Sequence, residues 1–417
     1  MTAASLLNLS WLNLLVGDMQ TGFGPFVSVR LTVAGWDPAK IGDLLSIGTI
    51  ASIAAQVPAG LLVDSTPAKR SVAAAAIVTT MLALLLVAAR PGFVPMVAAE
   101  VLQGFAGAVL TLAIAAITLT LTPHEALGER LGRNVRFAAI GAASGSVVLG
   151  LVGSTVAPAM VFVAAAACGL PALLVLRRIA GPPLLRVRKR RPGPTPAPAP
   201  APPRWAKRRL LRDRRLLAFI ACAFAFHLSN AAQLPLAATE ATHHADGWAD
   251  IVTGAALTVP QLMVAALSPW VGALANRRGR RFVLLLGFAA LPARALLFAA
   301  SSAPAMVIGA QSLDGVSSAV FGVLLPLVVA DLTHTGGRFN FALGLVSVAC
   351  ALGASISNPL AGAVAKAAGL PAAFLVLAAL GAGAVALVWL MMPETAPLRA
   401  TAAPARRRDS KLTPDLT

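Results

Sequence analysis

The sequence has few charged residues and no tyrosine, and the shortage of charge limits the classes of protein it can be. Charged side chains make up 12% of its 417 residues, whereas 58% are hydrophobic and the mean hydropathy is +0.80. Soluble globular chains are about a quarter charged, so this chain has more apolar surface than a water-soluble fold can bury. A soluble enzyme, a coiled coil and a disordered chain are therefore excluded. The composition predicts an integral membrane protein.

Cysteine is also scarce, and the residues that carry most enzyme chemistry are not grouped. Cys168, Cys222 and Cys350 lie far apart in apolar runs, with no disulfide or metal-site spacing. The pair His243-His244 is at most a fragment of a metal site. No nucleophile, base and orienting group are clustered, and no glycine-rich phosphate loop precedes a helix. We therefore expect no enzyme activity, no cofactor and no metal.

Twelve apolar windows are long enough to cross a bilayer, which takes about 20 residues. They lie near 5–33, 40–63, 71–89, 92–121, 131–156, 158–177, 214–238, 249–275, 282–301, 304–332, 339–365 and 370–392. The first window has no basic leader and no cleavage site, so we expect it to remain as a helix. The predicted fold class is an all-α membrane protein with twelve transmembrane helices.

The basic residues predict how the chain lies in the membrane. Segments that face the cytoplasm are enriched in Lys and Arg. With the N-terminus in the cytoplasm, the inward-facing segments hold every basic residue except Arg30, Lys40, Arg90, Arg294 and Lys366. We expect a multi-pass protein of the inner (plasma) membrane with both termini in the cytoplasm. Because the positive charge is confined to short segments between spans, no nucleic-acid partner is expected.

A basic, proline-rich segment separates the sixth window from the seventh. Basic clusters at 186–191 and 204–209 flank an alternating Pro/Ala run at 192–203, which favours an extended spacer. The clusters are expected to bind anionic lipids at the cytoplasmic face, and the alternative is that they bind a protein partner. The predicted domains are an N-terminal six-helix bundle at 1–178, a basic, Pro/Ala-rich cytoplasmic linker at 179–213, a C-terminal six-helix bundle at 214–393 and a basic cytoplasmic tail at 394–417.

The two halves of the chain repeat one another. Leu102-Gln103-Gly104 corresponds to Leu313-Asp314-Gly315, an offset of about 211 residues, and the segment 56–64 corresponds to 267–276. Each of these last two segments is followed by basic residues. Such a duplication predicts two pseudo-symmetric bundles with a binding site between them near mid-membrane.

On these residues the chain resembles the major facilitator superfamily of secondary transporters. The loop signature of that family is Gly, three residues, Asp, Arg or Lys, any residue, Gly, and two further basic residues. The second half has it as Gly272-Ala-Leu-Ala-Asn276-Arg277-Arg278-Gly279-Arg280-Arg281, with Asn in place of Asp. The first half keeps Gly60 and Asp64, has Pro67 in place of Gly, and has Lys69-Arg70 one place later. The resemblance implies the superfamily fold, alternating access and a small-molecule substrate.

The signature loop is thought to hold the cytoplasmic side of the family's members shut. The resemblance carries this gating role to Gly60, Asp64, Lys69, Arg70, Gly272, Asn276, Arg277 and Arg280. Physically, the two glycines allow close helix packing, and Asp64 can face a helix N-terminus or a basic side chain. We expect the second loop, which has Asn276, to be the weaker latch. Alternatively, the basic residues only fix the topology.

Ionisable residues inside the apolar windows are the main candidates for function, because a charge at the bilayer centre costs about 2.5–3.5 kcal/mol. The family often has Arg, two residues, Gln, Gly in the fourth helix, whereas this chain keeps Gln103-Gly104 and has Glu100 at the Arg position. The residues predicted to bind substrate or protons are Asp18, Gln20, Glu100, Gln103, His227, Asn230, Gln233, Arg294 and Asp314.

Roles for these residues follow from their sequence positions. His227, Asn230 and Gln233 recur every three residues and are expected to line a cavity from one helix face. Asp18 and Glu100 are predicted to carry the coupling proton. Two alternatives stay open: Asp314 and Arg294 form a structural ion pair, and His227 is an ordinary helix contact.

The sequence thus predicts a monomeric, proton-coupled exporter that uses a proton gradient to move small amphipathic compounds, cationic or neutral. The acids favour such substrates, and export is favoured because the cavity is expected to be apolar and poor in the Asn, Gln and aromatic residues of a sugar site. One alternative is an importer or exporter of a polar metabolite or organic ion. Another is a membrane scaffold or sensor that transports nothing.

Overall fold

The computed structural model describes residues 3–23, 25–89, 92–179, 211–237, 249–333 and 338–395. These residues are nearly all helical, and no strand occurs among them. The Pro/Ala linker, His243 and His244, and the basic tail beyond Thr395 lie outside the described residues.

In the described part of the N-terminal half there are eight α-helices and a short 3-10 turn. They are α1 (Ala3–Thr21), α2 (Pro25–Val33), α3 (Pro38–Ser65), α4 (Lys69–Ala89), α5 (Phe93–Leu121), η1 (His124–Ala126), α6 (Leu127–Thr155), α7 (Met160–Ala167) and α8 (Gly169–Arg178). The C-terminal half comprises α10 (Arg214–Asn230), α12 (Ala249–Arg278), α13 (Arg280–Ala300), α14 (Pro304–Thr333), α15 (Phe339–Ala368) and α16 (Leu370–Met391).

The predicted spans correspond to these helices. Among the described residues, eleven helical segments are long and apolar enough to cross a membrane, and they match the second to twelfth windows. The first window is divided between α1 and α2, and the sixth between α7 and α8, which meet at Cys168. The all-α membrane fold predicted from hydropathy is confirmed.

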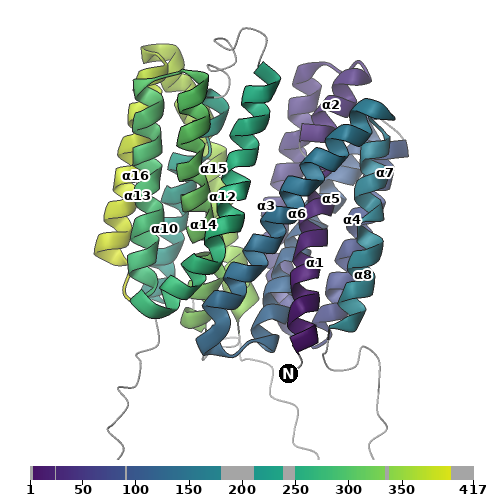
Figure 1. Ribbon diagram of the computed structural model, residues 1–417, viewed down its shortest axis with the longest axis horizontal. Helices are drawn as coiled ribbons and strands as arrows, with labels where there is room; N and C mark the ends of the chain where they lie inside the picture. Colours follow the sequence, from purple (N-terminus) through teal and green to yellow (C-terminus); the bar gives the residue numbers. More distant parts are fainter. Residues whose placement is uncertain are drawn as a thin grey trace, which may run out of the picture.

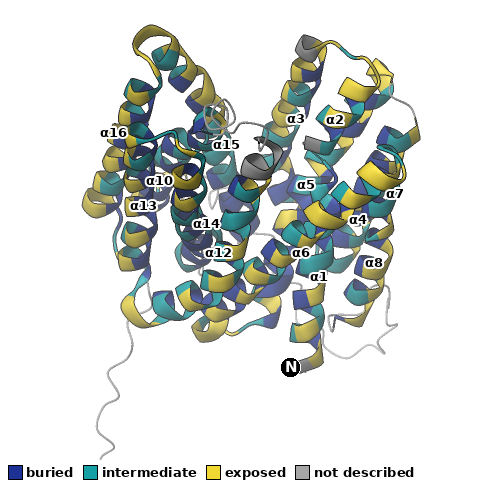
Figure 2. Cartoon of the chain, turned by 45° about the horizontal axis from the view of Figure 1, so that its top comes forward, coloured by how far each residue is buried: buried dark blue, intermediate teal, exposed yellow. Residues whose placement is uncertain are grey.

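The helices form two bundles, one from each half of the chain (Figure 1). We call the face of the molecule on which the N-terminus lies the N face. The bundles approach each other near the N face and diverge toward the opposite face, and exposed residues cover much of their outer surface (Figure 2). Large apolar side chains such as Val94 and Leu390 are among the most exposed, as expected for a surface in contact with lipid.

Two helix pairs, α3 with α15 and α6 with α12, make the most extensive contacts between the bundles, and glycines bring their backbones together. On the α3–α15 side, a Cβ at Gly60 would overlap the carbonyl of Asn340, and one at Gly344 would crowd that of Gln56. On the α6–α12 side, Gly272 lies against the carbonyl of Gly128 in the same way, and Gly132 against that of Ser268. Small residues allow this close approach. We call these contacts the two glycine seams, and both lie toward the N face.

Candidate functional site

A polar cavity of about 520 Å³ lies where the two bundles diverge. Helices α1, α3 and α5 supply most of its wall, and Ser347 of α15 contributes from the other bundle. We call it the central cavity. Its polar lining residues are Gln20, Thr49, Ser52, Gln56, Glu100, Gln103, Thr111 and Ser347, and no aromatic residue is among the described lining residues.

The expectation that the cavity is poor in glutamine is therefore wrong, whereas the expected shortage of aromatic residues holds for its described lining. Gln20, Gln56 and Gln103 come from three different helices, and each has mainly small or apolar neighbours in sequence. A single glutamine in an apolar window is only a weak indication of a binding site. Only the packing of α1, α3 and α5 brings the three amides to one wall.

Glu100 is the acidic residue of this wall. It is only 8% exposed, and its carboxyl packs so closely on α3 that a Cβ at Gly48 would overlap Oε2. Its Oε1 has no hydrogen-bond partner within the described part of the chain. A buried carboxylate without a cation is costly, so this position is suited to binding a proton or a positively charged group.

A smaller cavity of about 230 Å³ adjoins the central one, because Gln20 and Thr111 line both. It lies between α1, α5, α6 and α14, and it is bordered by Asn134, whose side chain donates to the Thr118 hydroxyl at 2.9 Å. Its described lining is mainly apolar, and Asn13, Thr118 and Asn134 are among its few polar residues.

Asp18 lies apart from both of these cavities. Gln20 faces the central cavity, and Asp18, two residues earlier on α1, faces α6 and the α7–α8 junction. The thiol of Cys168 donates to its Oδ2 at 3.2 Å, and a Cβ at Gly145 would overlap Oδ1. The structure does not bring Asp18 and Glu100 together, and a shared proton-carrying role for them stays a prediction.

Arg294 organises a second polar group inside the C-terminal bundle. Its side chain is 1% exposed, and its guanidinium donates to Asn230 Oδ1 at 2.6 Å and to Gln233 Oε1 at 2.8 Å. A longer bond of 3.3 Å reaches Gln311 Oε1, and Asp314 forms an ion pair with Nη1. The alternative that Asp314 and Arg294 pair with each other is confirmed.

This pairing changes the role of the polar face that His227 and Asn230 of α10 were predicted to share with Gln233, which follows the end of that helix. Gln233 is fully buried, so the expectation that it lines a cavity is wrong; its amide is used to hold Arg294. His227 contacts aromatic rings instead, with its ring centroid 5.1 Å from that of Phe321. His227, Asn230 and Gln233 therefore all contact residues of their own bundle.

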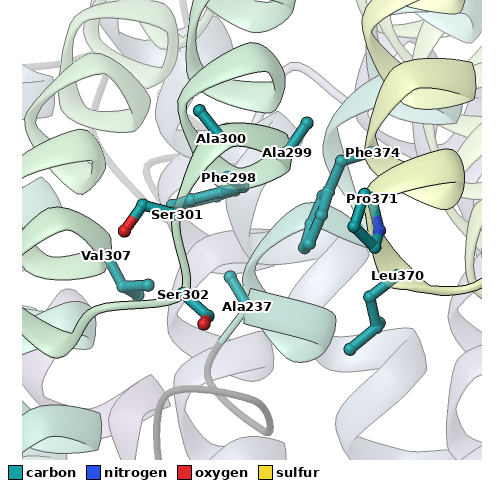
Figure 3. Close-up of a pocket in the computed structure, with 10 residues that line it drawn as sticks. All are labelled: Ala237, Phe298, Ala299, Ala300, Ser301, Ser302, Val307, Leu370, Pro371 and Phe374. Atoms are coloured by element: carbon teal, nitrogen blue, oxygen red, sulfur yellow. The ribbon is translucent and has the colours of Figure 1, made fainter.

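A cavity of about 390 Å³ lies inside the C-terminal bundle between the end of α13 and the start of α16, and its lining residues are shown in Figure 3. The rings of Phe298 and Phe374 lie 5.5 Å apart in its wall, beside Ser301 and Ser302. The Arg294 guanidinium lies 5.8 Å from the Phe298 ring centroid. None of the residues predicted from the sequence lines this cavity, because its residues come from helix ends and loops without a distinctive motif.

Asp64 joins α3 to α15 by hydrogen bonds beside the glycine contacts of that helix pair. It accepts hydrogen bonds from the backbone N–H groups of Asn340 and Phe341 at 3.1 and 2.9 Å, and from the Asn340 side chain at 2.8 Å. These residues are at the N-terminus of α15, where unpaired N–H groups favour an anion. The expectation that Asp64 faces a helix N-terminus is confirmed.

The equivalent loop of the second half makes different contacts. Asn276 donates one hydrogen bond to a described residue, the Glu125 carbonyl at 3.0 Å, compared with the three that Asp64 accepts. Arg280 bonds Asp331 at 2.8 Å, and Asp331 also pairs with His124 of the N-terminal bundle at 2.9 Å. Neither residue was predicted from the sequence, because His124 lies between two apolar windows, Asp331 lies at the end of another, and neither belongs to a motif.

The remaining gating candidates do not bridge the bundles through any hydrogen bond or ion pair found among the described residues. Arg70 donates to the Arg177 carbonyl at 2.8 Å, at the end of α8 in its own bundle. Arg277 is exposed, and Lys69 is partly exposed. Of the eight predicted gating residues, Gly60, Asp64, Gly272 and Asn276 lie at the seams. Arg280 donates to the Ala275 carbonyl of α12 at 3.0 Å and reaches the other bundle through Asp331 and His124.

Removal of the Asp64 carboxylate is expected to open the N face. Asp64→Ala deletes hydrogen bonds to a charged group, each worth about 1.5–3 kcal/mol net, so the closed population should fall at least tenfold. The measurement is the distance between spin labels at exposed positions 65 and 278, in a background lacking the three native cysteines. Asp43→Ala, which removes an exposed acid from the same helix, is the control. An unchanged distance distribution in Asp64→Ala would contradict the latch.

Comparisons with known proteins agree with this architecture. The family model for the Major Facilitator Superfamily matches residues 2–244 and 220–416. Two relatives from Mycobacterium tuberculosis strains, each named an uncharacterised MFS-type transporter, are 37% identical over 393 residues, which is 93% of this chain and 93% of theirs. The class B tetracycline resistance protein of Escherichia coli is 34% identical over 102 residues, or 22% of this chain and 25% of that protein.

Solved structures show the same fold. The Escherichia coli fucose:proton symporter FucP superposes with a TM-score of 0.74 at 15% identity, covering 93% of this chain and 98% of that one. FucP in the outward conformation gives a TM-score of 0.73 at 16% identity, covering 94% and 98%. At this identity the likeness concerns the fold alone.

Proposed function

Because this chain belongs to the major facilitator superfamily of secondary transporters, we propose that it is a proton-coupled exporter of small cationic or neutral compounds, with Glu100 as the coupling carboxyl. The protein is a multi-pass membrane transporter and not an enzyme. The observation that carries the proposal is Glu100 itself, buried in the wall of the central cavity without a cation among the described residues.

The coupling follows from competition for one carboxyl. Glu100 can hold a proton or a positively charged substrate, and binding of one displaces the other. If the bundles rock only when this site is neutralised, each cycle exchanges a proton for a substrate molecule. The neighbouring amides and hydroxyls offer hydrogen bonds, which favours a substrate with polar groups beside its charge.

The direction depends on how the chain lies in the membrane. We assign the N face to the cytoplasm of a cell with an inner (plasma) membrane, because exposed basic residues such as Arg133, Arg277 and Arg278 lie at this end of α6 and α12. Both termini are then cytoplasmic, and the seams close the cytoplasmic side. The named function of the tetracycline resistance protein, although it matches over only 102 residues, supports export.

A second candidate is transport of a polar metabolite or organic ion, in either direction. The three glutamines of the central cavity favour it, because amide groups bind hydroxyl-rich or zwitterionic solutes well. For both candidates the chain acts as a monomer, with a small-molecule substrate, no cofactor and no nucleic-acid partner. A proton gradient supplies the energy, and the basic linker contacts anionic lipid.

The experiment is transport by the purified full-length protein in liposomes with an imposed pH gradient. A panel of cationic, neutral and anionic compounds is offered outside liposomes with an acidic or an alkaline interior. One-for-one exchange of a proton for a cation gives about tenfold accumulation per pH unit, inside acidic liposomes only. Accumulation of a polar compound inside alkaline liposomes would instead indicate proton symport. Movement of no compound would favour the scaffold or sensor alternative.

A further inference from the structure

An apolar groove of about 780 Å³ runs along the membrane-spanning surface where α6 of one bundle meets α12, α13 and α14 of the other. It shares no lining residue with the central cavity. Leu267, Leu274 and Leu286 line its length, and Trp270 in its wall is 79% exposed. A groove of this kind in a spanning segment faces lipid, which is the local solvent.

One end of the groove carries positive charge from both bundles. Arg133 of α6 and Arg277 of α12 line it there, together with one acid, Glu129, which leaves a net charge of one positive unit. All three side chains are exposed. Neither guanidinium makes a hydrogen bond or an ion pair with any described residue, so both are available to an anion.

The depths of these residues in the membrane match those of the headgroup and acyl chains of a phospholipid. Arg277 lies in the last turn of α12 at the N face, seven residues after Trp270, which is about 10 Å along the helix at 1.5 Å per residue. Arginines at a helix end lie at headgroup depth, and exposed tryptophan is favoured at the membrane interface. The leucines continue from there toward the bilayer centre.

We propose that this groove binds an anionic diacyl phospholipid of the leaflet at the N face, with its phosphate between Arg133 and Arg277 and an acyl chain along the leucines. Because the lining comes from both bundles, the groove exists only while α6 and α12 are together. The bound lipid therefore stabilises the conformation closed at the N face. The site does not depend on the direction of transport or on which leaflet this is.

The test is quenching of Trp270 fluorescence by brominated lipids. The full-length protein is reconstituted in phosphatidylcholine bilayers that contain increasing fractions of brominated phosphatidylglycerol or brominated phosphatidylcholine, and the signal of Trp270→Phe is subtracted to isolate this residue. Two interfacial arginines are expected to produce about a tenfold preference for the anionic lipid. Arg133→Gln/Arg277→Gln should lose this preference.

A matched control separates the groove from general surface charge. Arg136→Gln/Arg278→Gln removes two exposed arginines of the same helices that do not line the groove, and it should retain the preference. Equal quenching by the two lipids in the unmodified protein would overturn the proposal, as would equal loss of preference in both double variants. Absence of quenching by either lipid, in a protein that migrates as a dimer, would assign the groove to a second copy.

Discussion

Glu100→Gln is expected to abolish proton-driven accumulation of substrate in liposomes, from about tenfold per pH unit to none. Glutamine has nearly the same shape as glutamate and can keep the packing on Gly48, so the fold should survive. It cannot take up or release a proton in this pH range, and it carries no charge to attract a cation. Downhill movement of a neutral substrate can persist, because the bundles no longer require a proton to neutralise the site.

The measurement compares accumulation in acidic-interior liposomes for three proteins. Asp43→Asn, which neutralises an exposed acid of α3, is the control and should accumulate substrate normally. Full accumulation by Glu100→Gln would remove Glu100 from the coupling. Asp18→Asn in the same assay tests the pairing predicted from the sequence: if it also loses accumulation, two separate carboxyls of the N-terminal bundle carry the proton.

Asp314→Leu is expected to destabilise the C-terminal bundle strongly. It leaves the Arg294 guanidinium charged in the interior of that bundle, where breaking a buried ion pair costs about 3–5 kcal/mol. Asn230 and Gln233 still accept hydrogen bonds from it, but neither carries a compensating charge. Unfolding of the purified protein by denaturant, followed by tryptophan fluorescence, measures the loss.

The double variant Arg294→Met/Asp314→Leu separates the charge from the packing. With both charges gone, most of the lost stability should return, because replacing a buried pair by apolar residues is often nearly neutral. Recovery will be incomplete, since Asn230 and Gln233 then lose their donor, and an unsatisfied buried acceptor costs about 1–3 kcal/mol. Additive losses in the double variant would show that the two residues do not act as a pair.

Much of the fold could be predicted from the sequence because membrane spans depend on local composition. Runs of about 20 apolar residues are sufficient to locate the helices, and the repeated loop around Gly60 and Gly272 identified the family. The contact of Asp64 with a helix N-terminus was also predictable, since its place at the inner end of a span left few partners for a carboxylate.

The site was less predictable because a membrane helix has two apolar environments. In a soluble protein, periodic hydrophobic residues show which face is buried, but here lipid and core are both apolar. The sequence therefore could not show that Gln20 faces the central cavity whereas Asp18 faces α6. It also gave no sign that His124 and Asp331, more than 200 residues apart, would meet across the bundles.

The glycine seams affect the free-energy difference between the conformations that are open and closed at the N face. Glycine has no rotamers to freeze, so bringing these backbones together costs almost no side-chain entropy, and separating them recovers almost none. The open and closed conformations can then remain nearly equal in free energy. A difference of about 1.4 kcal/mol, the worth of one pH unit, suffices to reverse which of them predominates.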